Sequence, residues 1–406
     1  MNELIPSSSR RKEYPSTTAT DVNLLTKLLA VITLASPVYG SSMDVTGPDY
    51  GLLIVSFLIL MGVSQVGVVF CAICRLVYAQ WAKPFYRLAE LSTMAFAPFA
   101  IVGFILIFIY EQELFYWLNA SADPHLSGVT ASWLTSDGLL YRNLYALLAF
   151  YGLSWFYVSK GVQQDRLNQE EVQQRKVERQ LFLLSPWVIG GFVLCNTFIA
   201  WDFAMMIVPA SHGHQWVSTV FPIHFWFGSV FAGTAALIAF PALLGRSNTS
   251  PFNERHIRQL STLVTSFTLL WLYFYWAQFF VIWFGNMPHE FEPLWRQMYG
   301  HYAPYYWTMI SGCFFIPLAA LIFAVFNRST VAMCAVAVSI GVGAWVNKYL
   351  MIITVFSDDA RLSDSLGQLG LSIVLALAFV SVLYALAKRY STYSNWEMSL
   401  SPNPDR

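Results

Sequence analysis

Residues 51–76 read GLLIVSFLILMGVSQVGVVFCAICRL and contain no charged side chain before Arg75. A helix needs about 20 mainly apolar residues to cross the hydrocarbon core of a bilayer, so this stretch is long enough to span a membrane. The whole chain has the same character. Of its 406 residues, 56% are hydrophobic and 11% are charged, against roughly a quarter charged in soluble domains. The sequence therefore predicts an all-α polytopic membrane protein.

Further stretches resemble the first, which brings the prediction to about ten transmembrane helices. The others are residues 23–43, 91–110, 141–160, 183–205, 218–244, 260–285, 303–326, 329–355 and 367–388. The stretch 23–43 is short and interrupted by Pro37 and Gly40, so it could also be a signal peptide with residues 10–12 as its basic region. We favour an uncleaved helix, because the polar lead of roughly twenty residues is long for a signal peptide.

Lysine and arginine are distributed unevenly over the segments between these spans. Cytoplasmic loops carry the excess of basic residues in membrane proteins. With the N-terminus inside, only Arg142, Arg296 and Arg361 of the 23 Lys and Arg residues fall on outer segments, and Lys348 falls within a span. The distribution predicts an N-in, C-in topology.

This topology divides the chain into a cytoplasmic tail over residues 1–22, one transmembrane domain over residues 23–390 and a second cytoplasmic tail over residues 391–406. The inner segment 161–182 is charged and rich in Gln, so we expect it to extend a helix beyond the membrane. The net charge is zero, which gives no reason to expect a nucleic-acid partner.

The cysteines lie in apolar runs, which argues against a disulfide framework. Cys71 and Cys74 form a C-x-x-C pair, but Arg75 follows where covalent haem attachment needs His. We therefore predict buried thiols. A bis-histidine haem b needs two imidazoles at membrane depth, and in the sequence only His224 qualifies. No phosphate loop, iron–sulfur motif or nucleophile–base arrangement is recognisable, so we do not expect an enzyme acting alone.

Two ionisable residues flank the outer loop after the fifth predicted span. Asp202 ends that span, and His224 lies one or two turns inside the next, so the two side chains could meet near the outer interface. A titratable group at membrane depth is costly and often takes part in proton movement. One interpretation is a proton relay. The other is that Asp202 caps the loop or the next helix and that His224 is a hydrogen-bonded core imidazole.

Lys348 and Glu90 are two further candidates for a proton path. Lys348 lies near the outer end of the ninth predicted span, where it could extend to the interface or pair with an acid such as Asp202. Glu90 follows Arg87 at helical contact spacing, in the pattern Trp81-x5-Arg87-x2-Glu90. A local salt bridge is one interpretation of this pattern, and a proton entry from the inner face is the other.

Several uncharged polar residues also fall at membrane depth. They are Ser64, Gln65, Asn196, Thr197 and Gln278. Such groups hydrogen-bond between helices or order water in a proton path. In the outer loops, His212 and His214 have no third metal ligand at a suitable spacing, so we expect them to contact a partner. Glu111 and Glu113 are expected to be solvated.

Three of these stretches resemble a known family. They are Asp202-Phe-Ala-Met-Met, His214-Gln-Trp-Val-Ser-Thr-Val-Phe and Gln278-Phe-Phe-Val-Ile-Trp-Phe-Gly-Asn-Met-Pro-His-Glu290. They are similar to motifs of the F subunit of alternative complex III, which belongs to the NrfD, or polysulfide-reductase-type, membrane family. The Trp81…Arg87-x-x-Glu90 element and Gln164-Asp165 also look similar. The chain departs from the family pattern at residues 207–211, Ile-Val-Pro-Ala-Ser, and the His-x-Trp-x-Ser-Thr order carries one extra residue.

The resemblance covers most of residues 23–330. It implies an NrfD-like fold of two four-helix bundles plus two helices in the bacterial cytoplasmic membrane. It also implies partners: a homologous quinol-binding subunit, a periplasmic iron–sulfur protein and c-type cytochrome subunits, besides lipids. Such a complex oxidises quinol, here expected to be menaquinol, and passes electrons through haem c to a cytochrome c or copper protein. This subunit would carry no redox cofactor, and would support assembly and conduct protons through Glu90, the mid-membrane polar groups, Asp202 and His224.

Two other functions remain open on the sequence. The chain could hold its own quinone site, because an aromatic pocket with a His and an acid suits a quinone head group. It could instead be an autonomous transporter. Transporters often have Gly or Pro breaks at matched positions in their two halves, and Pro186, Pro222, Pro241 and Pro317 do not pair in this way.

Overall fold

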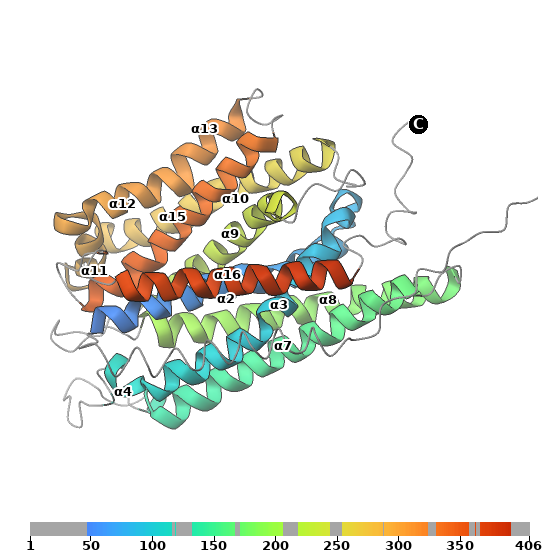
Figure 1. The fold of residues 1–406 in the computed structure, drawn as a ribbon. Coiled ribbons are helices and arrows are strands. Elements are labelled where there is room, and N and C mark those ends of the chain that lie inside the picture. The colour runs from blue at the N-terminus through green and yellow to red at the C-terminus, as the bar shows by residue number, and fades with distance from the viewer. Residues whose placement is uncertain are drawn as a thin grey trace, which may run out of the picture.

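The computed structural model describes residues 47–115, 118, 132–166, 171–205, 218–243, 254–286, 288–323, 330–356, 362 and 366–390. Within these ranges the chain is almost entirely helical, and the long helices run roughly along one common direction (Figure 1). The predicted span 23–43, the pair His212 and His214, and both predicted tails lie outside the described residues.

The long helices are α2 (Gly47–Leu76), α3 (Lys83–Ile109), α7 (Ser136–Arg166), α8 (Glu171–Ala200), α9 (Phe221–Leu243), α10 (Glu254–Phe284), α15 (Thr330–Phe356) and α16 (Leu366–Arg389). Shorter helices are α4 (Glu111–Leu114), α11 (Pro288–Met298), α12 (Ala303–Ile310) and α13 (Ile316–Ile322). Seven helical segments of the described chain are long and apolar enough to cross a membrane. They coincide with seven of the predicted spans, and they are compatible with a multi-pass membrane protein.

The predicted spans 141–160 and 303–326 are helical but are not among these seven. Helix α7 is long, yet it carries polar side chains towards both ends, including Arg142 and Lys160. The stretch from residue 303 is divided into α12, a π-helical turn (Ser311–Phe315) and α13. The turn lies close to α15, because a Cβ added to Gly312 would be 2.9 Å from the carbonyl oxygen of Ser339.

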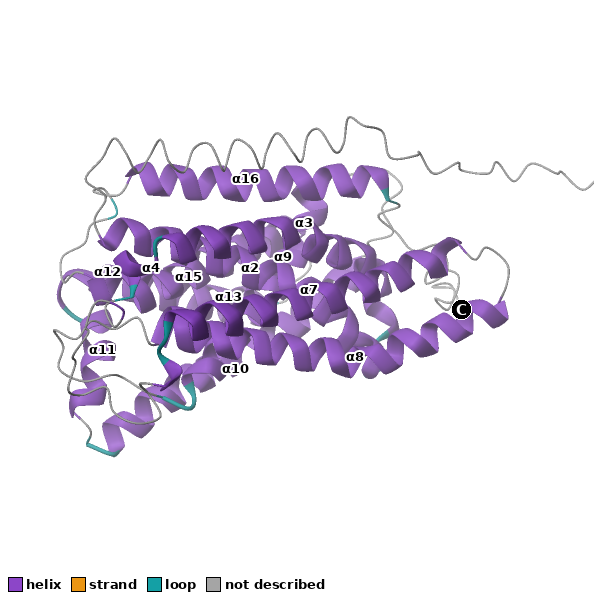
Figure 2. Cartoon of the chain, turned by 90° about the horizontal axis from the view of Figure 1, so that it is seen from below, coloured by secondary structure: helices purple, strands orange, loops and turns teal. Residues whose placement is uncertain are grey.

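The sequence predicts that the segment 161–182 extends a helix, and in the structure it extends two. Helix α7 continues to Arg166 and α8 begins at Glu171. Figures 1 and 2 show α7 and α8 projecting beyond the other helices at one end of the molecule. We refer to this end as the Glu90 end and to the opposite one as the Asp202 end.

The helices pack in two neighbouring groups. Helices α2, α3, α7 and α8 form the first group, and α9, α10, the α12–α13 segment and α15 form the second. Helix α2 packs against members of both groups, and α16 lies along one flank against α2 and α3 (Figure 2). Gly67 permits the close approach of α2 and α3, since a Cβ there would be 2.0 Å from the carbonyl oxygen of Ala89.

Cys71 and Cys74 are buried and unbridged, which confirms the prediction of buried thiols. The other cysteines within the described ranges, Cys195, Cys313 and Cys334, are also free.

Candidate functional site

Asp202 is held by side chains from the neighbouring helix α7 and the segment before it. It lies in a π-helical turn (Trp201–Met205) that follows α8. Arg142 donates two hydrogen bonds to its carboxylate, Nε to Oδ2 at 2.9 Å and Nη2 to Oδ1 at 2.8 Å. Asn143 donates a third at 2.6 Å and the Trp133 indole a fourth at 3.3 Å. The Arg142 guanidinium also lies 4.0 Å from the centre of the Trp133 ring.

This arrangement differs from the expected contact between Asp202 and His224. The Asp202 side chain is 1% exposed and that of Arg142 is 13% exposed, so the pair is largely shielded from water. Planar guanidinium and carboxylate groups match in a two-bond geometry. Because α7 and α8 pack directly against each other, Arg142 reaches Asp202 from the adjoining helix, whereas His224 points towards the second group of helices. Asp202 is therefore an ion-paired anchor between α7 and α8, and the structure does not pair it with His224.

Glu90 lies at the opposite end of the same four-helix group, in a cluster of buried charges. Arg87 contacts it at 2.8 Å, which confirms the local salt bridge. Arg75, at the end of α2, approaches Glu90 at 3.5 Å and Glu178 of α8 at 3.7 Å. The side chains of Arg75, Arg87 and Glu90 are at most 4% exposed, while Glu178 is 41% exposed. The cluster thus joins a buried carboxylate to a solvent-accessible one through a single arginine.

Helix α7 completes this cluster. Arg75 donates a 2.7 Å hydrogen bond to the Tyr157 hydroxyl, which lies 3.5 Å from the Ser185 hydroxyl of α8. Gly161 leaves room for the acid, because a Cβ there would be 3.1 Å from Oε1 of Glu90. All four helices of the first group therefore contribute to the environment of Glu90.

Polar side chains between the two ends meet in the middle of the first group. Asn196 donates a 2.7 Å hydrogen bond to Gln65, which confirms the expected contact between helices. Thr93 of α3 donates to the Ser64 carbonyl oxygen at 2.6 Å. The Tyr151 hydroxyl lies beside Ser64 and Gln65.

One buried face of α7 links these three clusters. Asn143, Tyr151, Ser154 and Tyr157 are all at most 5% exposed. At a rise of 1.5 Å per residue, Asn143 and Tyr157 lie about 21 Å apart along the helix axis. Among the described residues, Asn143 Oδ1, Ser154 Oγ and Asn196 Oδ1 are buried without a hydrogen-bond partner. Buried polar atoms of this kind are normally satisfied by ordered water.

His224 and Lys348 lie in the second group of helices. The Nε2 of His224 is 3.4 Å from the amide nitrogen of Asn347, and its ring lies against Trp271 and Tyr275. Lys348 is 2% exposed. Its ammonium group is 3.3 Å from the carbonyl oxygen of Phe225 and also contacts that residue's ring. Lys348 thus neither pairs with Asp202 nor extends to an interface.

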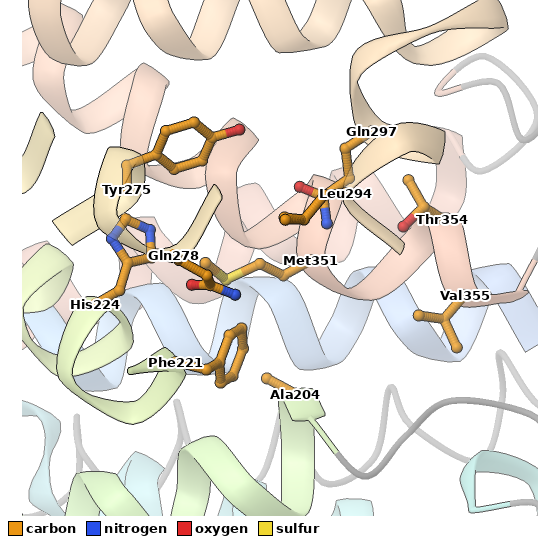
Figure 3. Close-up of a pocket in the computed structure, with 10 residues that line it drawn as sticks. All are labelled: Ala204, Phe221, His224, Tyr275, Gln278, Leu294, Gln297, Met351, Thr354 and Val355. Atoms are coloured by element: carbon orange, nitrogen blue, oxygen red, sulfur yellow. The ribbon is translucent and has the colours of Figure 1, made fainter. Parts of the chain in front are cut away.

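Gln278 lines a small pocket together with His224 and Tyr275 (Figure 3). Figure 3 shows the amide of Gln278 between Phe221 and Met351, with the His224 ring nearby. The pocket has a volume of about 30 Å³, which is enough for one or two water molecules. Small-molecule sites usually need about 300 Å³ or more. The described residues around His224 therefore enclose water-sized space, and they do not favour the quinone site that the sequence left open.

Sequence reasoning missed the partners of the candidate acids. In the sequence, Arg142 is only one of three basic residues on the outer segments, and Arg75 is only the residue that follows the C-x-x-C pair. The scarcity of outer basic residues was an available signal for Arg142, because a cation at an unfavoured location needs a specific role. Nothing in the sequence marked Asn143 or Tyr157, since their importance depends on which face of α7 is buried.

Glu111 accepts hydrogen bonds from Ser136 at 2.8 and 3.0 Å, so it has a protein partner as well as partial exposure to solvent. Across the described ranges, no three His, Cys, Asp or Glu side chains come together as metal ligands. The chain matches the sequence model of no protein family, and no curated protein matches it significantly.

Proposed function

We propose that this chain is an integral membrane subunit of a quinol-oxidising electron-transfer complex of the alternative complex III type. In this role it supports assembly and conducts protons, while partner subunits bind quinol and carry haem c and iron–sulfur clusters. The chain itself carries no redox cofactor. Its sequence motifs at Asp202, His214 and Gln278 support the family assignment.

The observation that supports proton conduction most directly is the buried polar series in the first group of helices. It runs from Glu90 through Tyr157, Ser154 and Tyr151 to Asn143 beside Asp202. The length of about 21 Å from Asn143 to Tyr157 is a large part of a hydrocarbon core of about 30 Å. Polar residues inside a membrane are costly and typically mark ion or proton pathways.

Glu90 is the proposed proton entry, and its cluster explains how a proton could reach it. Glu178 is partly exposed, and both carboxylates approach the same guanidinium of Arg75. A proton arriving at Glu178 can be relayed by water to Glu90 along this bridge. The hydroxyls of Tyr157 and Ser185 extend the hydrogen-bonded series into the bundle.

The widest step of the series lies near the Asp202 end, where Tyr151 and Asn143 are about 12 Å apart along the axis of α7. Asn196 of α8 provides a shorter route, because it bonds Gln65 beside Tyr151. Asn196 and Asp202 belong to one continuous helical segment and lie about 9 Å apart along its axis. Two or three water molecules are enough to cross that distance, and the unsatisfied Asn143 and Asn196 oxygens point to where they would bind. Asp202 ends the series as a carboxylate whose charge is balanced by Arg142.

The proposal includes the finer features expected from the sequence. The chain has about ten transmembrane helices, arranged as two four-helix bundles plus two helices. Both termini are cytoplasmic, and the membrane is the bacterial cytoplasmic membrane. The Glu90 end then faces the cytoplasm, in agreement with the basic residues gathered there.

Affinity purification of the tagged chain from its native membrane in mild detergent tests the assignment. We expect haem c, measured by absorbance, to co-elute with quinol oxidation activity and with an iron–sulfur protein. An unrelated tagged polytopic protein from the same membrane is the control. If the chain elutes folded but with no more haem c than the control, the proposal is wrong.

A further inference from the structure

We infer that a cleft at the Glu90 end binds the phosphate group of an anionic glycerophospholipid. The cleft has a volume of about 410 Å³, a size typical of small-molecule sites. It lies between the end of α2, the start of α3 and the first half of α8. This inference does not depend on quinol oxidation, because it concerns a separate surface of the chain.

The charge of the cleft indicates an anionic ligand. Its lining includes Arg75, Lys83, Arg175 and Arg179, against the single carboxylate of Glu178. Arg175 and Arg179 are exposed and lie one turn apart on α8, so both can contact one phosphate group. Lys83 is the first residue of α3, so the positive end of that helix's dipole adds to the charge of its side chain.

The apolar residues beside the cleft indicate a lipid and not free phosphate. Leu183 and Trp187 follow Arg175 and Arg179 at four-residue spacing on α8, and they are 59% and 71% exposed. These four positions form one stripe along α8, which is cationic near the helix end and apolar towards the middle of the bundle. Acyl chains attached to a bound phosphate could lie along this stripe. Basic pockets between helices at the cytoplasmic face are known to recognise anionic head groups.

An aromatic pair forms the edge of the same cleft. The rings of Tyr78 and Phe182 stack with their centres 5.6 Å apart, and both residues line the cleft. Tyr78 has a φ of 53°, a left-handed conformation that is unfavourable for a bulky residue such as tyrosine. Conformations of this kind cluster at ligand-binding sites. Tyrosine is also typical of the membrane interface, where the glycerol region of a lipid lies.

The cleft is linked to the proposed proton entry through Arg75, which lines it and contacts both Glu90 and Glu178. A bound phosphate would compete with Glu178 for Arg75. We therefore expect lipid occupancy to change the environment of Glu90, although the binding test below does not rely on this effect.

Binding can be measured on the full chain in detergent micelles that contain either phosphatidylglycerol or phosphatidylcholine. Native mass spectrometry counts bound lipid, and thermal unfolding reports stabilisation. We expect phosphatidylglycerol to bind and stabilise the chain, and Arg179→Gln to weaken this binding about tenfold, as expected for loss of one charge-assisted hydrogen bond. Lys176→Gln is the matched control, since it removes one positive charge from the same exposed helix without lining the cleft.

Each alternative has a distinct result. Equal binding of the two lipids, or equal effects of Arg179→Gln and Lys176→Gln, overturns the inference. If inorganic phosphate at millimolar concentration displaces the lipid and stabilises the chain equally well, the ligand of the cleft is free phosphate and not a lipid. If Arg179→Gln leaves lipid binding unchanged but the affinity-purified variant loses its partner proteins, the cleft is a protein contact. If Arg179→Gln does not fold, Lys83→Gln on the opposite wall provides the same test.

Discussion

Replacing Asp202 by Asn tests the buried ion pair at the Asp202 end. The substitution keeps the size of the side chain but removes its charge, so Arg142 loses its two-bond carboxylate partner. The guanidinium, only 13% exposed, then stays in a poorly solvated site without a counter-charge. We expect the fold to lose stability even though no apolar contact is removed.

The expected magnitude follows from the burial of the pair. Removing one member of a buried ion pair usually costs 3–5 kcal/mol. The Asn oxygen can still accept two of the four hydrogen bonds, for example those from Arg142 Nη2 and the Trp133 indole, so we expect the lower end, about 3 kcal/mol. Arg142→Gln should cost a similar amount by leaving the carboxylate uncompensated. The double variant should be less destabilised than the sum of the single variants, by about 2 kcal/mol, because the two residues act as one unit.

The assay is unfolding of the purified chain in mixed micelles of a mild detergent and dodecyl sulfate, followed by circular dichroism. Asp137→Asn is the control, because it also removes a carboxylate at this end but on an exposed position of α7. If Asp202→Asn costs no more than Asp137→Asn, or if the costs of the Asp202 and Arg142 variants simply add, the ion pair does not anchor α7 to α8.

Other variants test the packing and the remaining buried groups. Gly67→Ala should strongly destabilise the chain, since its Cβ would clash with the backbone of α3. Gly152→Ala should be tolerated, because no atom lies within 4 Å of its added Cβ. Equal unfolding midpoints of the two variants would contradict this packing. Lys348→Met should raise the unfolding midpoint, because a buried ammonium group is replaced by an apolar side chain of similar length; a lower midpoint would mean that the charge stabilises the fold. Cys71 should resist maleimide until the protein is denatured, and rapid labelling at this position in the native chain would contradict its burial.

The sequence predicted long apolar helices well, because hydropathy averaged over about 20 residues identifies such segments directly. It located some helix starts closely, as at Thr330 and Leu366, and others poorly. The predicted span 91–110 begins at residue 83 in the structure, and its first turns contain Arg87 and Glu90. These charges are buried only because they pair with each other and with Arg75, which a hydropathy pattern does not detect.

The candidate acids were predictable from their cost in a membrane, but their partners were not. Asp202 and Arg142 are 60 residues apart in sequence, and they meet because α7 packs on α8 with one particular face inward. The lack of a pair between Asp202 and His224 has the same origin. The two residues are only 22 positions apart in the sequence, yet their side chains turn towards different groups of helices. Proximity along the chain was therefore a poor guide to contact.

The proposed role of Glu90 can be measured most directly as the number of protons translocated per electron. The intact complex is purified, reconstituted in proteoliposomes and supplied with quinol and an electron acceptor. For Glu90→Gln we predict that quinol oxidation continues while the proton-to-electron ratio falls at least twofold, and Glu111→Gln, at the other end of the molecule, should leave the ratio unchanged. An unaltered ratio in Glu90→Gln would contradict the proton path through the first group of helices.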